Sequence, residues 1–422
     1  MVKASFPSAG FWMALVILTM TIRQLSLWKL GEDAAHGRIG DMVLLLVVGL
    51  WFGGRCLMGR FAMIRNRLDL AVILLLLFFV ASIFWADNIQ AGGIRSLKLL
   101  RNGMLYFVLA DYLSTDFPNR YKNIAICVVV TGLFQSLAYL VAIGQNGGLT
   151  ALSALLQADS VASNDPILAV VRKDQGGALF LQGVASWLPL GMFLGFSIQR
   201  TIRSPLVSWG NWVLICSMGV LTLLSGTRAA MVALAAGVVV IFLLSAKDLT
   251  VEKLLAGGLG AAILLVGAWV FNLQAFVGSR MSVDTLQYDP SVTARLTFYK
   301  FALDRFSESP WVGVGVANIF PDGLTAVHNA YLQVLAEVGV VGGLIFLWIL
   351  ALWTVYLMSA SAFASRWGDR MQKRFAVSIL GGSVFFFVYF LVGHDLGSSE
   401  PWLLMSMTSA LHNSVRIARD SS

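Results

Sequence analysis

The stretch Asn329-Ala-Tyr-Leu-Gln-Val-Leu-Ala-Glu-Val-Gly-Val-Val-Gly-Gly-Leu-Ile-Phe-Leu-Trp-Ile-Leu-Ala-Leu-Trp-Thr-Val-Tyr-Leu-Met358 decides the fold class of this chain. Its only charged residue is Glu337, and apolar side chains fill most of the other positions. About 20 mainly apolar residues are enough for a helix to cross the hydrocarbon core of a bilayer. The stretch therefore predicts a membrane-spanning helix over 329–358.

The rest of the chain repeats this pattern. Hydrophobic residues make up 58% of the 422 residues and charged residues 12%, with a mean hydropathy of +0.79. A soluble domain has about 45–50% apolar and about 25% charged residues, so a bilayer must be the solvent for most of this chain. We predict an all-α polytopic membrane protein with a single domain over 1–422. The expected spans, about twelve by length, are 6–22, 42–58, 68–85, 97–113, 121–144, 177–198, 207–224, 229–245, 254–273, 329–358, 375–393 and 400–415.

Basic residues gather in alternate short loops between these spans. Because loops rich in Lys and Arg stay on the cytoplasmic side, we predict that the N- and C-termini are both cytoplasmic. The longer loops 145–176 and 274–328 then lie on the outer face, and non-spanning segments of that length are usually functional. The basic residues predicted on the inner side are Lys3, Arg55, Arg60, Arg65, Arg67, Arg120, Lys122, Arg200, Arg203, Lys247, Lys253, Arg366, Arg370, Lys373, Arg374, Arg416 and Arg419.

The composition argues against several classes of function. The net charge of +8 comes without a basic cluster interleaved with aromatic residues, so we attribute it to contact with membrane lipids and expect no nucleic acid. The three cysteines are scattered, and the outer loops contain no Asp-x-Asp pair and no His cluster with metal-ligand spacing. The chain has no P-loop and no Rossmann glycine fingerprint. We therefore expect no metal, no cofactor and no nucleotide site.

The large outer loop 274–328 holds most of the candidate site residues. Arg280 lies near its start, and the run Pro310-Trp-Val-Gly313-Val-Gly315 lies near its end. Between them, 293–306 reads as an amphipathic helix that would lie in the plane of the outer membrane interface. Its predicted apolar and charged faces are Leu296, Tyr299, Phe301, Leu303 and Phe306 against Arg295, Lys300, Asp304 and Arg305.

His328 and Glu337 mark the entry into the span 329–358. A histidine at a membrane boundary is often an interface anchor or a helix cap, but it can also be a general base, since its ordinary pKa lies near working pH. A carboxylate at the depth of Glu337 in the membrane costs free energy unless it has a partner. It implies either a function or a buried link to a Ser or Arg of a neighbouring helix.

Further cations lie at the predicted outer ends of spans. Arg228 belongs to Ser225-Gly-Thr-Arg-Ala-Ala230, a hairpin between two spans, and a guanidinium there suits the two phosphates of a diphosphate. Arg95, Lys98 and Arg101 share one helix face by their spacing, and Arg172 precedes the sixth span. Contact with phospholipid headgroups is the alternative interpretation for each of these residues.

These segments resemble the O-antigen ligase/polymerase superfamily. The resemblance rests on SGTRAA after a span, SxxxRLxFYKFALDRF, SPWVGVGVANIF and HNAYLQVLAEVGVVGGLIF, in this order. The earlier run Ser82-Ile-Phe-Trp-Ala-Asp87, followed by a basic helix start, also fits. The resemblance covers about residues 70 to 350. Its most specific part is G-x-G followed by H-N-x-Y-L-x-x-L-x-E-x-G.

The resemblance implies a metal-independent transfer of a glycan from an undecaprenyl-diphosphate carrier at the periplasmic side of a Gram-negative inner membrane. The acceptor is a lipid A-core sugar in the ligase branch, which we favour, another carrier-linked repeat unit in the polymerase branch, and a protein side chain in a third branch. By the same resemblance, Arg228 and Arg295 contact the diphosphate and His328 is the acceptor base. Further expected substrate contacts are Arg280, Arg95, Lys98, Arg101, Arg172, Gly313, Gly315, Asn329 and Tyr331.

Two other classes of function remain open at this point. A transporter or flippase for the same kind of lipid should show charged or broken helices near the bilayer midplane and often an inverted repeat. The polar residues here gather instead at one predicted face, which favours an enzyme. A sensor or scaffold without catalysis would leave the grouping of Arg228, Arg295 and His328 without a purpose.

Overall fold

The computed structural model describes residues 13, 26–28, 37–57, 64–145, 177–224, 227–245, 290–320, 327–366, 370–392 and 396–420. Two short strands, β1 (Ser26–Trp28) and β2 (Gly37–Arg38), pair antiparallel ahead of the helices. The helices are α2 (Ile39–Leu57), α3 (Arg67–Ala81), η1 (Ser82–Trp85), α4 (Ile89–Ser114), α5 (Phe117–Gln145), α8 (Gly177–Ile198), η2 (Gln199–Thr201), α9 (Pro205–Leu224), α10 (Arg228–Ser245), α14 (Pro290–Glu308), α15 (Ala330–Arg366), α16 (Arg370–Val392) and α17 (Glu400–Asp420).

The helical class and the membrane character of the chain are confirmed. The predicted spans 6–22 and 254–273 lie outside the described residues, and each of the other predicted spans coincides with a helix. Within the described part, four helices are long and apolar enough to cross a membrane: Arg67–Trp85, Pro205–Leu223, Ala330–Ala364 and Met371–Leu391. The total of twelve crossings, the outer loops and the orientation remain predictions. The loop 145–176 and residues 274–289 lie outside the described part.

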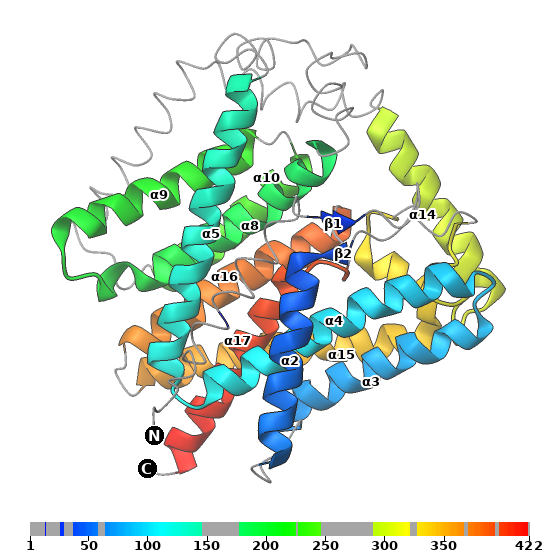
Figure 1. The fold of residues 1–422 in the computed structure, drawn as a ribbon, viewed down its shortest axis with the longest axis horizontal. Helices are drawn as coiled ribbons and strands as arrows, with labels where there is room; N and C mark the ends of the chain where they lie inside the picture. The colour runs from blue at the N-terminus through cyan, green and yellow to red at the C-terminus, as the bar shows by residue number, and fades with distance from the viewer. Residues whose placement is uncertain are drawn as a thin grey trace.

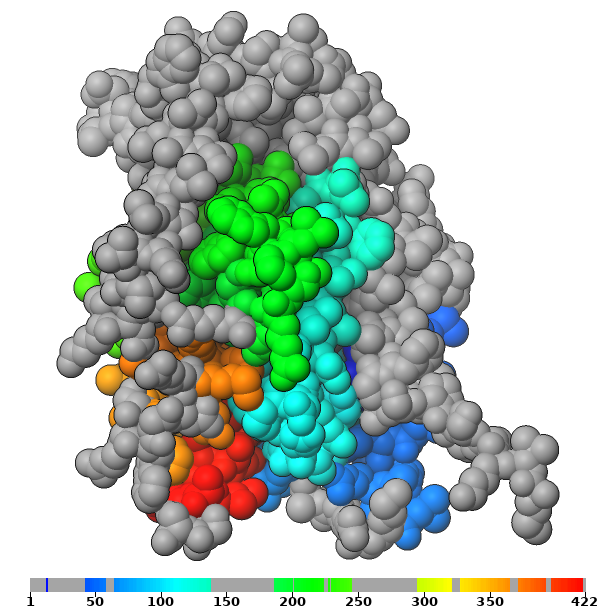
Figure 2. Space-filling model, turned by 90° about the vertical axis from the view of Figure 1, so that its left-hand side faces the viewer, coloured from blue at the N-terminus to red at the C-terminus, as the bar shows by residue number. Residues whose placement is uncertain are grey.

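The helices form two groups that share α17. In Figure 1, α3, α4 and α15 lie side by side, while α8, α10 and α16 form a second group with α9 beside α8. On the face in Figure 2, α5 and α9 meet along one surface. The C-terminal helix α17 packs against α4 and α15 of the first group and α16 of the second. Direct packing of α15 on α16 also joins the two groups.

A polar cluster joins α3, α4 and α17 on the side predicted to face the cytoplasm. Asp69 is buried and accepts hydrogen bonds from the Tyr106 hydroxyl at 2.5 Å, the Ser409 hydroxyl at 3.0 Å and the Arg65 main-chain N–H at 2.9 Å. The side chain of Asn66 caps α3 by accepting from the Asp69 N–H at 3.0 Å. Both oxygens of this buried carboxylate thus meet at least one donor, as a low-dielectric interior requires.

Helix α15 is broken by a sharp bend, so the prediction of one continuous span over 329–358 is wrong in this respect. Gly339 has φ 63° and ψ −165°, a region of backbone conformation that essentially only glycine adopts. The 37 residues of α15 would reach roughly 55 Å as one straight helix, far beyond a hydrocarbon core. The bend separates a short helix, 330–338, from a long one, 340–366.

Helix α14 forms where an amphipathic helix was predicted, and the place of its apolar face in the membrane interface stays a prediction. Arg295 and Arg305 are half-buried on the side that meets the protein, whereas Leu296 is 60% exposed and Leu303 49% exposed. The side of α14 that meets the protein is mixed, because Ala302, Tyr299 and Phe306 pack in an apolar cluster with Ile319, Val327 and Ala336. The guanidinium of Arg305 donates to the Asn318 carbonyl at 3.0 Å, so charge faces inward.

Candidate functional site

The loop that precedes α15 completes the backbone hydrogen bonds that the bend leaves open. In an unbroken helix the N–H groups of Val340 and Val341 would donate to the carbonyls of Ala336 and Glu337. Here they donate to Pro310 O at 2.8 Å and Trp311 O at 3.2 Å. The two vacated carbonyls accept instead from Val314 N at 2.9 Å and Gly315 N at 3.0 Å. We call this pairing of 310–318 with 336–341 the loop–bend junction.

Glycines allow the two backbones to approach this closely. A Cβ on Gly339 would lie 2.4 Å from the Trp311 carbonyl carbon, and one on Gly313 would lie 2.4 Å from the Glu337 carbonyl carbon. Gly313 and Gly315 also have φ values of 73° and 93°, in the left-handed region. The structure thus gives both glycines of the G-x-G run a packing role. Their predicted contact with substrate stays a prediction.

The Ser82–Asp87 run joins the same junction. The Ser82 hydroxyl accepts from the Val316 N–H at 3.1 Å, and the Asn318 side chain accepts from the Asn88 N–H at 2.9 Å. A Cβ on Gly315 would lie 2.8 Å from the Ala86 Cα. Three of the motifs that carry the family resemblance, at 82–87, 309–320 and 328–346, therefore meet in one assembly.

Glu337 lies at the centre of this assembly with its side chain 2% exposed. Its Oε1 accepts from the Ala317 N–H at 3.2 Å and from the Gln333 Nε2 at 3.1 Å. The Nε of Arg95, on α4, lies 3.2 Å from the same oxygen. A buried link to an arginine of a neighbouring helix was one of the two interpretations of Glu337, and this one is confirmed.

His328 stands at the start of α15 in a strained backbone conformation. Its φ is 59°, which is uncommon for a residue other than glycine and clusters at functional positions. The next residue, Asn329, is the N-cap of the 330–338 helix, because its Oδ1 accepts from the Leu332 N–H at 3.0 Å. The imidazole ring is half-buried and stacks on Phe298 of α14, with ring centroids 6.4 Å apart and planes inclined by 27°.

Helix α14 brings Arg295 to the same place. The Tyr299 hydroxyl, one turn after Arg295, lies within hydrogen-bond distance of His328 O at 3.4 Å and Leu391 O at 3.3 Å. Burial raises the pKa of Tyr299 above its ordinary value, an effect that the nearby positive charge of Arg295 partly offsets. Arg295 also acts electrostatically on Tyr389 of α16. The structure thus groups Arg295 with His328 around Tyr299.

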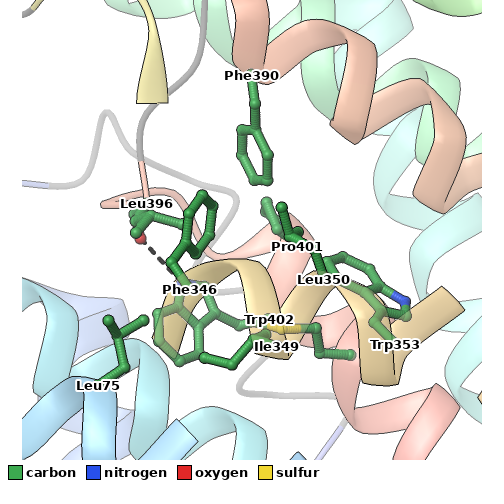
Figure 3. Close-up of a pocket in the computed structure, with 10 residues that line it drawn as sticks. Leu75, Phe346, Ile349, Leu350, Trp353, Phe390, Leu396, Pro401 and Trp402 are labelled. Carbon is green, nitrogen blue, oxygen red and sulfur yellow. Dashed lines mark hydrogen bonds between the residues drawn. The ribbon is translucent and has the colours of Figure 1, made fainter. Parts of the chain in front are cut away.

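Tyr331 anchors this grouping to α16. Its hydroxyl donates to the Phe387 carbonyl at 3.0 Å, and its ring packs against those of Phe346 and Phe390. These two phenylalanines also line a small apolar cavity, shown in Figure 3. On the α17 side of the cavity, Trp402 donates to the Leu396 carbonyl at 2.9 Å.

The three cations predicted to share a face of α4 have different surroundings. Arg95 pairs with Glu337, whereas Arg101 donates to the Asn102 side chain at 3.1 Å and to the Gly397 carbonyl at 3.4 Å. Lys98 is exposed. Arg95 and Arg101 therefore contact protein partners, which argues against the interpretation that all three cations contact only phospholipid headgroups.

Three predicted cations cannot be joined to this grouping from the described residues. Arg228 is the first residue of α10, just after Thr227, whose carbonyl accepts from the Met231 N–H at 3.1 Å. The described part includes the backbone of Arg228 but not its side chain. Arg172 and Arg280 lie outside the described residues.

Sequence reasoning gave no role to Glu400, which proves to be fully buried. It opens α17, where its carboxylate accepts from the Ser186 hydroxyl of α8 and from the Ser399 hydroxyl at 3.4 Å. It also acts electrostatically on Tyr389, as Arg295 does with the opposite sign. An acidic residue beside a proline at the start of an apolar span was the available signal. Among the described residues, no three His, Cys, Asp or Glu side chains gather as a metal site would require.

Two comparisons with known proteins agree with the family resemblance found in the sequence. A family model described as O-antigen ligase matches residues 213–347, which include α14, His328 and the loop–bend junction. The chain is also similar to the teichuronic acid biosynthesis protein TuaE of Bacillus subtilis (strain 168), with 22% identity over 398 residues. That match covers 85% of this chain and 77% of the relative. The resemblance to the O-antigen ligase/polymerase superfamily is confirmed.

Proposed function

We propose that this protein transfers a glycan from an undecaprenyl-diphosphate carrier to a sugar hydroxyl of lipid A-core. The reaction would take place at the periplasmic face of the inner membrane of a Gram-negative bacterium. The observation that carries the proposal is the convergence of Arg295, Tyr299 and His328 beside the ends of apolar, membrane-length helices. A cation at that position can stabilise a charged leaving group, while an imidazole beside it can take the proton of a hydroxyl acceptor.

In the proposed reaction His328 takes the proton of the acceptor hydroxyl as its oxygen attacks the anomeric carbon of the donor glycan. A new carbon–oxygen glycosidic bond forms while the bond from that carbon to the diphosphate oxygen breaks. The bonding electrons leave with undecaprenyl diphosphate. A base in this role contributes about 10²–10⁴ in rate, and the strained His328 backbone is the kind of preorganised geometry that such a role needs.

Arginines would supply the complementary charge. Negative charge grows on the diphosphate as it leaves, and preorganised cations in a site of low dielectric stabilise it most effectively. Arg295 is half-buried at the right position for this role. We assign Arg228 and Arg280 to the same diphosphate as further contacts. Because guanidinium groups neutralise the diphosphate, the proposed transfer needs no metal ion.

A polymerase is the second candidate, with another carrier-linked repeat unit as the acceptor. One specific observation favours it, namely that the Bacillus subtilis relative is named for teichuronic acid biosynthesis. The description of the matched family as O-antigen ligase favours the first candidate. Donor chemistry and site residues are the same for both, so the two differ only in the acceptor.

A reconstituted assay tests the proposal directly. Purified protein in lipid nanodiscs receives carrier-linked glycan and core lipid in the presence of a metal chelator. Glycosylated core lipid is the expected product, and a lengthened carrier-linked chain identifies the polymerase instead. If neither product forms, while carrier-linked glycan crosses the membrane of proteoliposomes, the protein is a transporter and the proposed function is wrong.

A further inference from the structure

The 330–338 helix is fixed at both of its ends. Asn329 caps it beside His328, and Glu337 holds its other end to the preceding loop through Ala317 and to α4 through Arg95. The helix is roughly 13 Å long and too short to bend. His328 and Glu337 therefore move together, so a displacement at the carboxylate displaces the imidazole.

We propose that Arg95 and Glu337 are a positioning pair that fixes His328 where the acceptor hydroxyl is deprotonated. This inference rests on the proposed function. Neither residue touches the reacting atoms in this scheme, because both act through the 330–338 helix. Arg95 thereby receives a role different from the substrate contact that its sequence position suggested.

Burial makes the pair sensitive to the loss of one partner. The side chain of Glu337 is 2% exposed and that of Arg95 19% exposed, so neither charge is well solvated. Removing one partner leaves the other as an uncompensated buried charge, whereas replacing both with neutral groups relieves that cost. In Glu337→Gln the amide oxygen can still accept from Ala317 and Gln333, so this variant tests charge more than hydrogen bonding.

The test is a double-mutant cycle in nanodiscs with Arg95→Gln, Glu337→Gln and the combined variant. Because a misplacement of about 1 Å can cost on the order of 10²-fold in rate, each single variant is expected to lower kcat between about tenfold and a hundredfold. The KM for the donor stays unchanged. The combined variant recovers to within about threefold of the wild-type kcat, since the coupled sites are not additive.

A readout independent of catalysis accompanies the cycle. Hydrogen exchange at the amides of 327–341 is expected to quicken in each single variant and to return toward wild type in the combined variant. Arg101→Gln is the matched control, because Arg101 lies two turns along α4 and bonds to Asn102 and Gly397. In the double variant with Glu337→Gln, the effect of Arg101→Gln on kcat should simply add to that of Glu337→Gln.

Several results would overturn the inference. A combined variant as slow as Arg95→Gln, or a raised donor KM with kcat intact, would mean that Arg95 acts on the donor itself. Exchange in 327–341 unchanged in the single variants, or accelerated equally in every helix, would also exclude a specific positioning role. If the wild type transfers no glycan, the proposed function fails separately, and the exchange data still decide whether the pair holds the helix.

Discussion

The hydroxyl of Tyr299 lies 3.4 Å from the main-chain carbonyl oxygen of His328 and donates a hydrogen bond to it. Tyr299 belongs to α14, which crosses no membrane in the predicted topology, and His328 begins the helix pair that follows the loop. The same hydroxyl reaches the Leu391 carbonyl of α16 at 3.3 Å. One side chain thus sets the relative positions of the candidate base, the Arg295 helix and the end of α16.

Replacing Tyr299 with phenylalanine should slow glycan transfer without unfolding the protein. The change removes the single O–H donor that the two carbonyls share but keeps the ring, and such a hydrogen bond contributes about 0.5–1.5 kcal/mol. We expect a fall in kcat of several-fold in the nanodisc assay. The control is Tyr356→Phe, whose ring stacks on His412 away from the site and whose loss of hydroxyl should leave kcat unchanged.

The titration of Tyr299 offers a prediction on pH. Burial raises its pKa above 10.0 in the folded protein. A group with a raised folded-state pKa contributes stability that is complete below its ordinary pKa and is lost as the pH rises through the folded value. Wild type should therefore lose this contribution only at strongly alkaline pH, and Tyr299→Phe should lack it. Tyrosinate absorbance of the two proteins during alkaline titration measures the difference, and ionisation of Tyr299 at or below its ordinary value would contradict the prediction.

His328→Ala should lower the transfer rate by about 10²–10⁴ while the protein still inserts and folds. Arg228→Ala and Arg295→Ala should also abolish most transfer, since each removes a positive charge that stabilises the departing diphosphate. Initial rates and thermal unfolding curves of the same preparations separate catalysis from stability. Arg203→Ala, an exposed residue of the predicted inner side, is the matched control. Wild-type rates in the His328→Ala variant would rule out its role as base.

Gly339→Ala should destabilise the protein severely. The alanine Cβ would lie 2.4 Å from the Trp311 carbonyl carbon and would force the backbone out of φ 63°. Backbone strain and overpacking together cost about 2–5 kcal/mol, which thermal unfolding in detergent should register. Gly93→Ala is the control, because nothing lies within 4 Å of the added Cβ. In that helical position alanine should stabilise the protein by about 0.5–1 kcal/mol.

Asp69→Asn should lower stability but leave catalysis intact. The amide keeps one acceptor oxygen, which can still accept from Tyr106 and Ser409, but its NH2 group then faces the Arg65 N–H, so that donor loses its partner at about 1–3 kcal/mol. The melting temperature should fall while kcat at low temperature stays at the wild-type value. Asp116→Asn, on an exposed turn, should change neither. A large loss of kcat in Asp69→Asn would instead tie this cluster to the reaction.

The sequence was a good guide to where helices lie and a poor one to how they bend. Apolar runs predict helix positions because the bilayer forces every backbone group to bond within its own segment. That argument says nothing about Gly339, which sits inside an apolar run and is bent only because 310–318 supplies replacement partners. Such pairing between distant segments leaves no periodic signal.

Only part of the candidate site could be predicted from the sequence, because contacts between distant segments decide the rest. His328 and Arg295 could be picked out by residue type and motif, and the structure brings them together. The inward turn of Arg295 and Arg305 could not be foreseen, because amphipathic patterning assumes that the buried side of a helix is apolar. On α14 that side holds apolar residues such as Ala302 and also Arg305, which donates to a carbonyl. Glu337 was foreseen as needing a partner, and only the fold could show that the partner is Arg95.

The loop–bend junction also limits how this chain can change length. Four backbone bonds fix 310–315 against 336–341 one residue at a time, so a single added or deleted residue would offset every donor from its acceptor. No such ladder constrains exposed positions before 310, such as Ser307 and Glu308. Relatives that diverge in the length of this region should therefore carry their insertions upstream of the proline, and a fluorescent or affinity tag should be introduced there too.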